Sequence, residues 1–158
     1  MGPVAFVAAW VGAPVAAMTA GFVAFGTGLP LFGLALRRNL RGPAWALATA
    51  TGAATLGVAA TPLGSPAGDT VHGAFAALGY ATLAGVPLSA AGPLAAAGRR
   101  GWARFSVVAG LTSAACLVAT TLGPRHGLFQ RAGLTAGDIW VAAFSVDLIR
   151  RARRGLRK

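Results

Sequence analysis

Residues 105–122 read FSVVAGLTSAACLVATTL, an apolar stretch without a single charged side chain. Arg104 precedes this stretch, and Gly123, Pro124 and Arg125 follow it. A helix needs roughly 20 mostly apolar residues to cross the hydrocarbon core of a bilayer. The stretch therefore predicts a transmembrane helix, with short basic segments marking its two ends.

The same unit, an apolar run ended by arginine, glycine or proline, recurs along the chain. We expect transmembrane helices over residues 14–36, 44–61, 70–97, 105–122 and 134–150. Residues 1–150 then form a single domain, an all-α membrane bundle of about five helices. A basic tail, residues 151–158, follows it.

Three residues refine this assignment. Pro87 and Pro93 fall inside the third expected helix, where proline removes a backbone hydrogen bond and predicts a kink or an early end. Trp10 precedes the first expected helix and is predicted to anchor an interfacial segment.

The composition excludes an ordinary soluble domain. Of the 158 residues, 56% are hydrophobic and only 11% are charged, whereas a soluble domain carries about 25% charged residues. The net charge of +11 comes from short basic clusters between apolar runs, which is the membrane pattern. No aromatic–basic RNA motif or zinc-finger spacing is present, so we expect membrane lipids as partners and no nucleic acid. A homo-oligomer or a membrane partner protein stays open.

The basic residues predict the topology. The first and third connections each hold three arginines and the segment from Arg150 holds six basic residues, whereas the second connection holds none and the fourth holds two. Short loops rich in Lys and Arg stay in the cytoplasm. Five spans therefore place the N-terminus outside and the C-terminus in the cytoplasm. The bias toward arginine, alanine and glycine suggests a GC-rich bacterial genome, and hence the inner or plasma membrane of a bacterium.

Two groups of residues carry a family resemblance. They are Thr61-Pro62-Leu63-Gly64-Ser65-Pro66 followed by Asp69 and His72-Gly73, and Gly127-Leu128-Phe129-Gln130-Arg131 followed by Ile139-Trp140. With the helix spacing, they make residues 14–150 resemble the bacterial and archaeal membrane family called domain of unknown function 998. That family is described with six spans, so the resemblance implies that its first helix is absent here. Gln130-Arg131 departs from the Glu-Arg pair expected there. The family has no assigned activity, so the resemblance implies fold and membrane location alone.

Two carboxylates fall within the last expected span. Asp138 and Asp147 are nine residues apart, roughly 13 Å along a helix, against about 30 Å of hydrocarbon. At least one of them must lie at hydrocarbon depth, and about 100° of rotation per residue puts them on opposite faces. For Asp147 we expect an ion pair with Arg150 or Arg151, three and four residues on; the alternative is a proton-binding carboxylate that faces the bundle.

Asp138 has two open interpretations. It could be a first-turn acid stabilised by the helix dipole, or a partner for Arg131 or Arg125. Asp69 precedes an apolar run and is predicted to be an N-cap. His72, three residues on, shares its side of the helix.

The predicted topology collects six ionisable residues at the outer side. They are Asp69, His72, Arg125, His126, Arg131 and Asp138. We interpret them as a binding site for a lipid head group, a small anion or a partner protein, since arginine pairs well with phosphate. The alternative is an ordinary solvated loop.

Sequence motifs give no reaction. The chain lacks the nucleophile elbow, the P-loop, the zinc-protease helix and the dinucleotide fingerprint. Its two histidines both fall on the predicted outer side, one of them in a loop, which disfavours a haem, and their spacing with an aspartate is not that of a zinc site. We therefore predict no catalytic residue, no metal and no cofactor, and a non-catalytic membrane protein. A small proton-coupled transporter, or a subunit of one, using Asp138 or Asp147, is the alternative function.

Overall fold

The computed structural model describes residues 3–61, 63–122 and 126–156, with the backbone alone for residues 3–15 and for His126. Five helices account for nearly all of them, and no strand occurs in these ranges. They are α1 (Pro3–Asn39), α2 (Ala44–Ala60), α3 (Pro66–Ala96), α4 (Arg100–Leu122) and α5 (His126–Gly155). The predicted all-α fold is confirmed.

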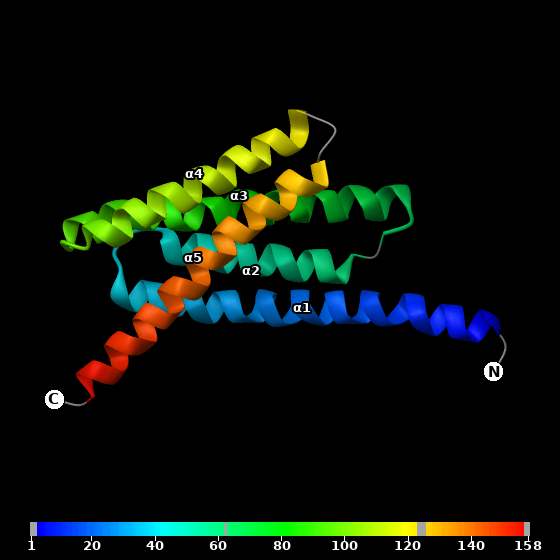
Figure 1. Ribbon diagram of the computed structural model, residues 1–158, viewed down its shortest axis with the longest axis horizontal. Coiled ribbons are helices and arrows are strands. Elements are labelled where there is room, and N and C mark those ends of the chain that lie inside the picture. The colour runs from blue at the N-terminus through cyan, green and yellow to red at the C-terminus, as the bar shows by residue number, and fades with distance from the viewer. Residues whose placement is uncertain (1–2, 62, 123–125, 157–158) are drawn as a thin grey trace.

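The helices are arranged in chain order. In Figure 1, α1 to α4 run back and forth beside one another, whereas α5 crosses them at an angle. Each of α2, α3 and α4 packs on the helix before it, and α5 packs on α4 and on α3. The connections therefore alternate between two ends of the molecule.

Length and hydropathy qualify four of the helical segments as membrane spans. They are Ala16–Asn39, Pro66–Ala96, Arg100–Leu122 and Gly127–Gly155. The apolar helix α2 has 17 residues, at the short end of the range for a transmembrane helix. The chain is thus a multi-pass membrane protein.

Two expectations about individual helices need correction. The first helix begins at Pro3, well before the expected residue 14, because the uncharged N-terminal segment continues the helix. The side chain of Trp10, the predicted interfacial anchor, lies outside the described residues. Of the kink or early end predicted at Pro87 and Pro93, the early end is wrong, because α3 continues to Ala96 and buries Pro87. The kink stays a prediction.

Glycine allows α1 and α2 to approach closely. A Cβ atom added to Gly52 would lie 2.6 Å from the carbonyl oxygen of Gly26 and 2.7 Å from the Cδ of Pro30. No Cβ fits at such distances, so the helix contact requires glycine there. Close approach of this kind is what stabilises helix pairs in lipid, where no hydrophobic force drives them together.

An aromatic cluster joins α5 to the other helices. The rings of Trp140 and Phe144 are fully buried and stack with centroids 5.0 Å apart. Phe32 of α1 meets both rings edge-on, at 6.2 and 6.5 Å. The indole N–H of Trp140 donates to Ser106 Oγ of α4 at 2.8 Å. This cluster fixes where α5 crosses the bundle.

Arginines gather at one end of the molecule. The ends of α1, α3 and α5 and the starts of α2 and α4 lie together at the left of Figure 1. The described arginines of these segments are Arg37, Arg38, Arg41, Arg99, Arg100, Arg104, Arg150, Arg151, Arg153 and Arg154. We call this the arginine end. The opposite end, where α2 and α4 end and α3 and α5 begin, is called the outer end, after the side of the membrane that the sequence predicts for it.

Candidate functional site

Asp69 at the outer end closes a turn. Its Oδ1 accepts a hydrogen bond from the backbone N–H of Gly64 at 2.9 Å, and Gly64 has a φ of +118°, which favours glycine. The prediction that Asp69 is the N-cap of this helix is wrong. Ser65 is the N-cap, and its Oγ accepts from the N–H of Gly68 at 3.1 Å, because the helix begins one turn earlier, with Pro66 as its first residue.

His72 ties α3 to the end of α2. Its Nδ1 lies 2.9 Å from the carbonyl oxygen of Thr61, the C-cap residue of α2. The ring N–H therefore donates to a carbonyl that the helix leaves unpaired. Asp69 and His72 thus both hold the α2–α3 connection in shape, and His72 is half-buried.

The remaining outer residues belong to the α4–α5 connection and α5. Arg125 and the side chain of His126 lie outside the described residues, although His126 begins α5. Arg131 is exposed, one to two turns into α5. Within the described part of the chain its guanidinium makes no ion pair and no hydrogen bond.

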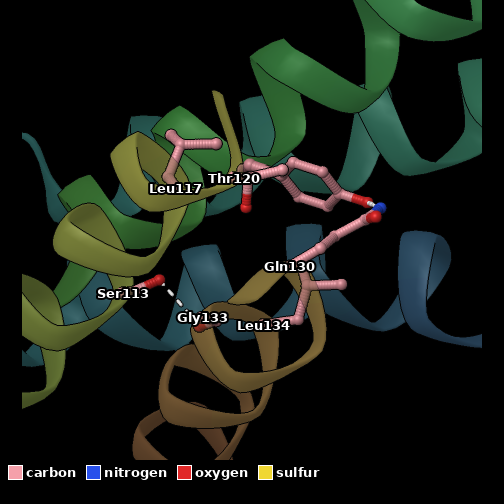
Figure 2. Close-up of a pocket in the computed structure, with 7 residues that line it drawn as sticks. Ser113, Leu117, Thr120, Gln130, Gly133 and Leu134 are labelled. Carbon is pink, nitrogen blue, oxygen red and sulfur yellow. Dashed lines mark hydrogen bonds between the residues drawn. The ribbon is translucent and has the colours of Figure 1, made fainter. Parts of the chain in front are cut away.

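A small pocket lies between α3, α4 and α5. Figure 2 shows Ser113 pointing to the backbone of Gly133, whose carbonyl oxygen accepts from Ser113 Oγ at 2.8 Å. The Nε2 of Gln130 donates to the hydroxyl of Tyr80. The space is about 10 Å³, which suits one water molecule at most. The pocket is therefore too small for a ligand.

Sequence reasoning did not identify the pairing of Tyr80 with Gln130. The two residues are fifty positions apart, and neither is charged, so no local pattern links them. The available signal was that Tyr80 is the one tyrosine of the chain and lies in an apolar run, where its hydroxyl needs a partner.

Asp138 lies on the exposed face of α5, and its side chain is exposed. Arg131 is seven residues, or two turns, before it on the same face. Among the described residues the carboxylate has no ion pair and no hydrogen bond. The hypothesis of an Asp138–Arg131 pair is therefore not supported by any contact in the described chain.

Asp147, at the arginine end, has two arginine partners. Its Oδ2 accepts from Arg151 Nε at 2.9 Å, the predicted helical pair, and from Arg99 Nη2 at 2.5 Å. Arg150 is exposed and is not part of the pair. The partner from the α3–α4 connection was not predicted, because Arg99 and Asp147 are 48 positions apart.

Aromatic rings surround the Arg99 guanidinium. Its Cζ atom lies 5.2 Å from the ring centre of Phe144 and 5.7 Å from that of Trp102. Cation–π contact of this kind holds a partly desolvated arginine in place. Arg99 therefore clamps the α3–α4 connection onto α5, and Asp147 supplies the compensating charge.

The described residues contain no group of three His, Cys, Asp or Glu side chains that could hold a metal ion. The polar and charged side chains discussed above fall into two groups, according to whether they have a partner among the described residues. Asp69, His72, Tyr80, Gln130 and Asp147 are engaged in hydrogen bonds or ion pairs. Arg131 and Asp138 are exposed and unpaired within the described ranges.

Comparison with known proteins supplies a family and no activity. No curated protein and no solved structure matches the chain. A family model described as "protein of unknown function (DUF998)" matches residues 8–147, nearly the whole bundle from α1 to α5. The chain belongs to the DUF998 family of proteins of unknown function, as its resemblance to that family predicts.

Proposed function

We propose that this protein is a non-catalytic membrane protein that binds a phosphate-type anion at its outer end, through Arg131 together with Arg125 and His126. One observation carries the proposal. Arg131 is an exposed guanidinium without a partner in the described chain, whereas the other described arginines are at the opposite end. Asp69 and His72 then shape the neighbouring turn and do not bind the ligand.

The chemistry of arginine supports an anion of this kind. A guanidinium presents several N–H donors in a planar fork and binds phosphate oxygens through two hydrogen bonds at once. Few carboxylates at the outer end can compete with such an anion for Arg131. The chain has three acidic residues in all, and Asp69 is bound to Gly64. A lipid head group and a small free anion share this chemistry.

Native mass spectrometry of the protein, extracted gently from its own membrane, tests the proposal. We expect a discrete added mass that Arg131→Ala loses and that Arg153→Ala, an exposed arginine at the other end of α5, retains. A mass in the phospholipid range identifies a head group, and a mass of about 100 Da, that of one phosphate, identifies a free anion bound through the same arginine chemistry. Unchanged retention in Arg131→Ala contradicts the site, and a bound protein supports a partner-binding function in its place.

Proton-coupled transport is the second candidate, and Asp138 is the observation that favours it. Its carboxylate lies well inside α5, exposed and without a partner among the described residues. Ionisable groups in a span are costly and commonly belong to a substrate or proton pathway. Asp147 is disfavoured for this role, since its carboxylate is already engaged by Arg99 and Arg151.

Proteoliposomes test this second candidate. If Asp138 carries protons, a proton-driven substrate flux measured for the wild type is lost in Asp138→Asn and kept in Asp69→Asn, the matched change in the first turn of α3. Flux that survives Asp138→Asn removes this carboxylate from the mechanism.

The same proposal includes the location and orientation of the chain. The gathering of arginines at one end supports an orientation with the arginine end in the cytoplasm. The bias of the sequence toward arginine, alanine and glycine supports a bacterial inner or plasma membrane.

A further inference from the structure

A shallow apolar groove lies between α3 and α4 at the arginine end. Its volume is about 600 Å³, within the range of ligand-binding clefts. The lining residues of α3 are Ala91, Gly92 and Ala95, and those of α4 are Ala103, Arg104, Val107 and Val108. The groove is thus apolar along its length and carries one cation.

Small side chains create this groove. A Cβ atom added to Gly92 would have no other atom within 4 Å, so the space over this glycine is open. Deeper in the bundle, Leu88 of α3 packs directly on Gly110 of α4. A Cβ atom added to Gly110 would lie 2.4 Å from the Cγ of Leu88, so no space remains between the helices there. The groove therefore starts at the arginine end and stops at Leu88.

Arg104 gives the groove a direction. Its side chain is exposed and makes no ion pair or hydrogen bond within the described residues. Val108 is one helical turn deeper on the same face of α4, and Arg100 is one turn toward the end of the molecule. A cation at the mouth followed by an apolar channel matches a phospholipid, whose phosphate sits above its acyl chains.

We propose that this groove binds one anionic phospholipid, with an acyl chain against Gly92 and Val108 and its head-group phosphate on Arg104. Basic sites between transmembrane helices on the side of the positive loops are suited to anionic head groups. The guanidinium of Arg104 supplies two hydrogen bonds to phosphate oxygens.

A second copy of the chain fits the groove less well. The chain has three acidic residues, and the one at the arginine end, Asp147, is already bound by Arg99 and Arg151. A copy in the same orientation in the membrane would place further arginines beside Arg104 without a free carboxylate to pair with them. A lipid phosphate brings the negative charge that this surface lacks.

Lipid titration followed by native mass spectrometry tests the proposal. The full-length protein in detergent is titrated with phosphatidylglycerol or with phosphatidylcholine carrying identical acyl chains. All titrations use the Arg131→Ala background, so that an anion site at the outer end does not contribute. We expect tighter binding of phosphatidylglycerol, which Arg104→Ala weakens about tenfold or more through loss of a charged hydrogen bond.

Two variants fill the groove from opposite sides. Gly92→Leu has room for its Cβ, and Val108→Trp enlarges a side chain that is 62% exposed. Both should reduce the binding of either lipid. Gly73→Leu, a glycine of α3 near the outer end that is equally free of neighbours, and Arg153→Ala should leave lipid binding unchanged.

Three outcomes overturn the proposal. They are equal binding of the two lipids by the parent protein, wild-type binding by a folded Gly92→Leu variant, and a dimer mass that Gly92→Leu abolishes. The last would assign the groove to a second copy. Circular dichroism and thermal unfolding establish that each variant is folded. If Gly92→Leu does not fold, Val108→Trp, which fills the groove from α4, tests in its place whether lipid binding is lost.

Discussion

Arg99 and Asp147 form an ion pair across 2.5 Å, between the α3–α4 connection and α5. Their side chains are 15% and 20% exposed, and the guanidinium also contacts the ring of Phe144. A pair this enclosed differs from a surface salt bridge, since removing one partner leaves the other charge without compensation.

We predict that Asp147→Ala lowers the free energy of unfolding by about 2–4 kcal/mol, because Arg99 then keeps a partly buried charge. Arg151→Ala removes a partner that is 52% exposed, and should cost less than about 1 kcal/mol. Thermal or denaturant unfolding in detergent micelles measures both. Equal losses of unfolding free energy in the two variants would show that the enclosed Arg99–Asp147 pair stabilises the protein no more than the exposed Arg151–Asp147 pair does.

The contact between α1 and α2 gives a second prediction. Gly52→Ala places a Cβ 2.6 Å from a backbone oxygen of α1, so the helices must separate, at a cost of about 1–3 kcal/mol. Gly28→Ala, on α1, meets no atom within 4 Å and should be neutral or stabilising, because alanine favours helix more than glycine does. The same unfolding assay compares them, and a stable Gly52→Ala protein would contradict the close approach.

The hydrogen bond between Trp140 and Ser106 gives a third prediction. Ser106→Ala leaves the buried indole N–H without its acceptor, which should cost about 1–3 kcal/mol. In Trp140→Phe the donor is absent too, so adding Ser106→Ala to that variant should cost much less. A double-mutant cycle measures the coupling between the two changes, and additive losses would mean that the bond contributes nothing.

The membrane orientation gives a fourth prediction. In a Cys116→Ala background, Leu63→Cys at the outer end should react with a membrane-impermeant maleimide in intact cells. Ala97→Cys at the arginine end should react only after the membrane is opened. Both positions are exposed in the structure, so access to the reagent depends on the side of the membrane. The reverse labelling pattern would invert the proposed topology.

The helices could be predicted from the sequence because apolar runs and arginines mark their limits directly. The starts of α1, α3 and α5 could not be placed as well, and α5 begins at His126, eight residues before the expected residue 134. No charge marks where α1 begins, and a proline–glycine turn preceding Asp69 suggested a later start for α3 than Ser65 and Pro66 give. The prediction from Asp69 overlooked a helix-start preference that α3 follows, serine at the N-cap and proline at the first helical position.

Contacts between distant helices were beyond sequence reasoning. The arginine at i+4 from Asp147 could be predicted because one helix carries both residues. Arg99 could not, since its position depends on how α5 crosses α4. The candidate site is smaller than predicted for the same reason. The sequence grouped the outer residues only by their predicted side of the membrane. In the fold, Asp69 and His72 bind the backbone of the α2–α3 connection, and Arg131 is left exposed.

The crossing of α5 also bears on biogenesis. Helices α1 to α4 each pack on a chain neighbour, so hairpins can assemble as they leave the translocon. The rings that complete the aromatic core, Trp140 and Phe144, belong to the last helix synthesised, and they meet Phe32 of the first. A nascent chain released before α5 would therefore expose an unfinished core to lipid, and membrane quality control could recognise such a chain by that surface.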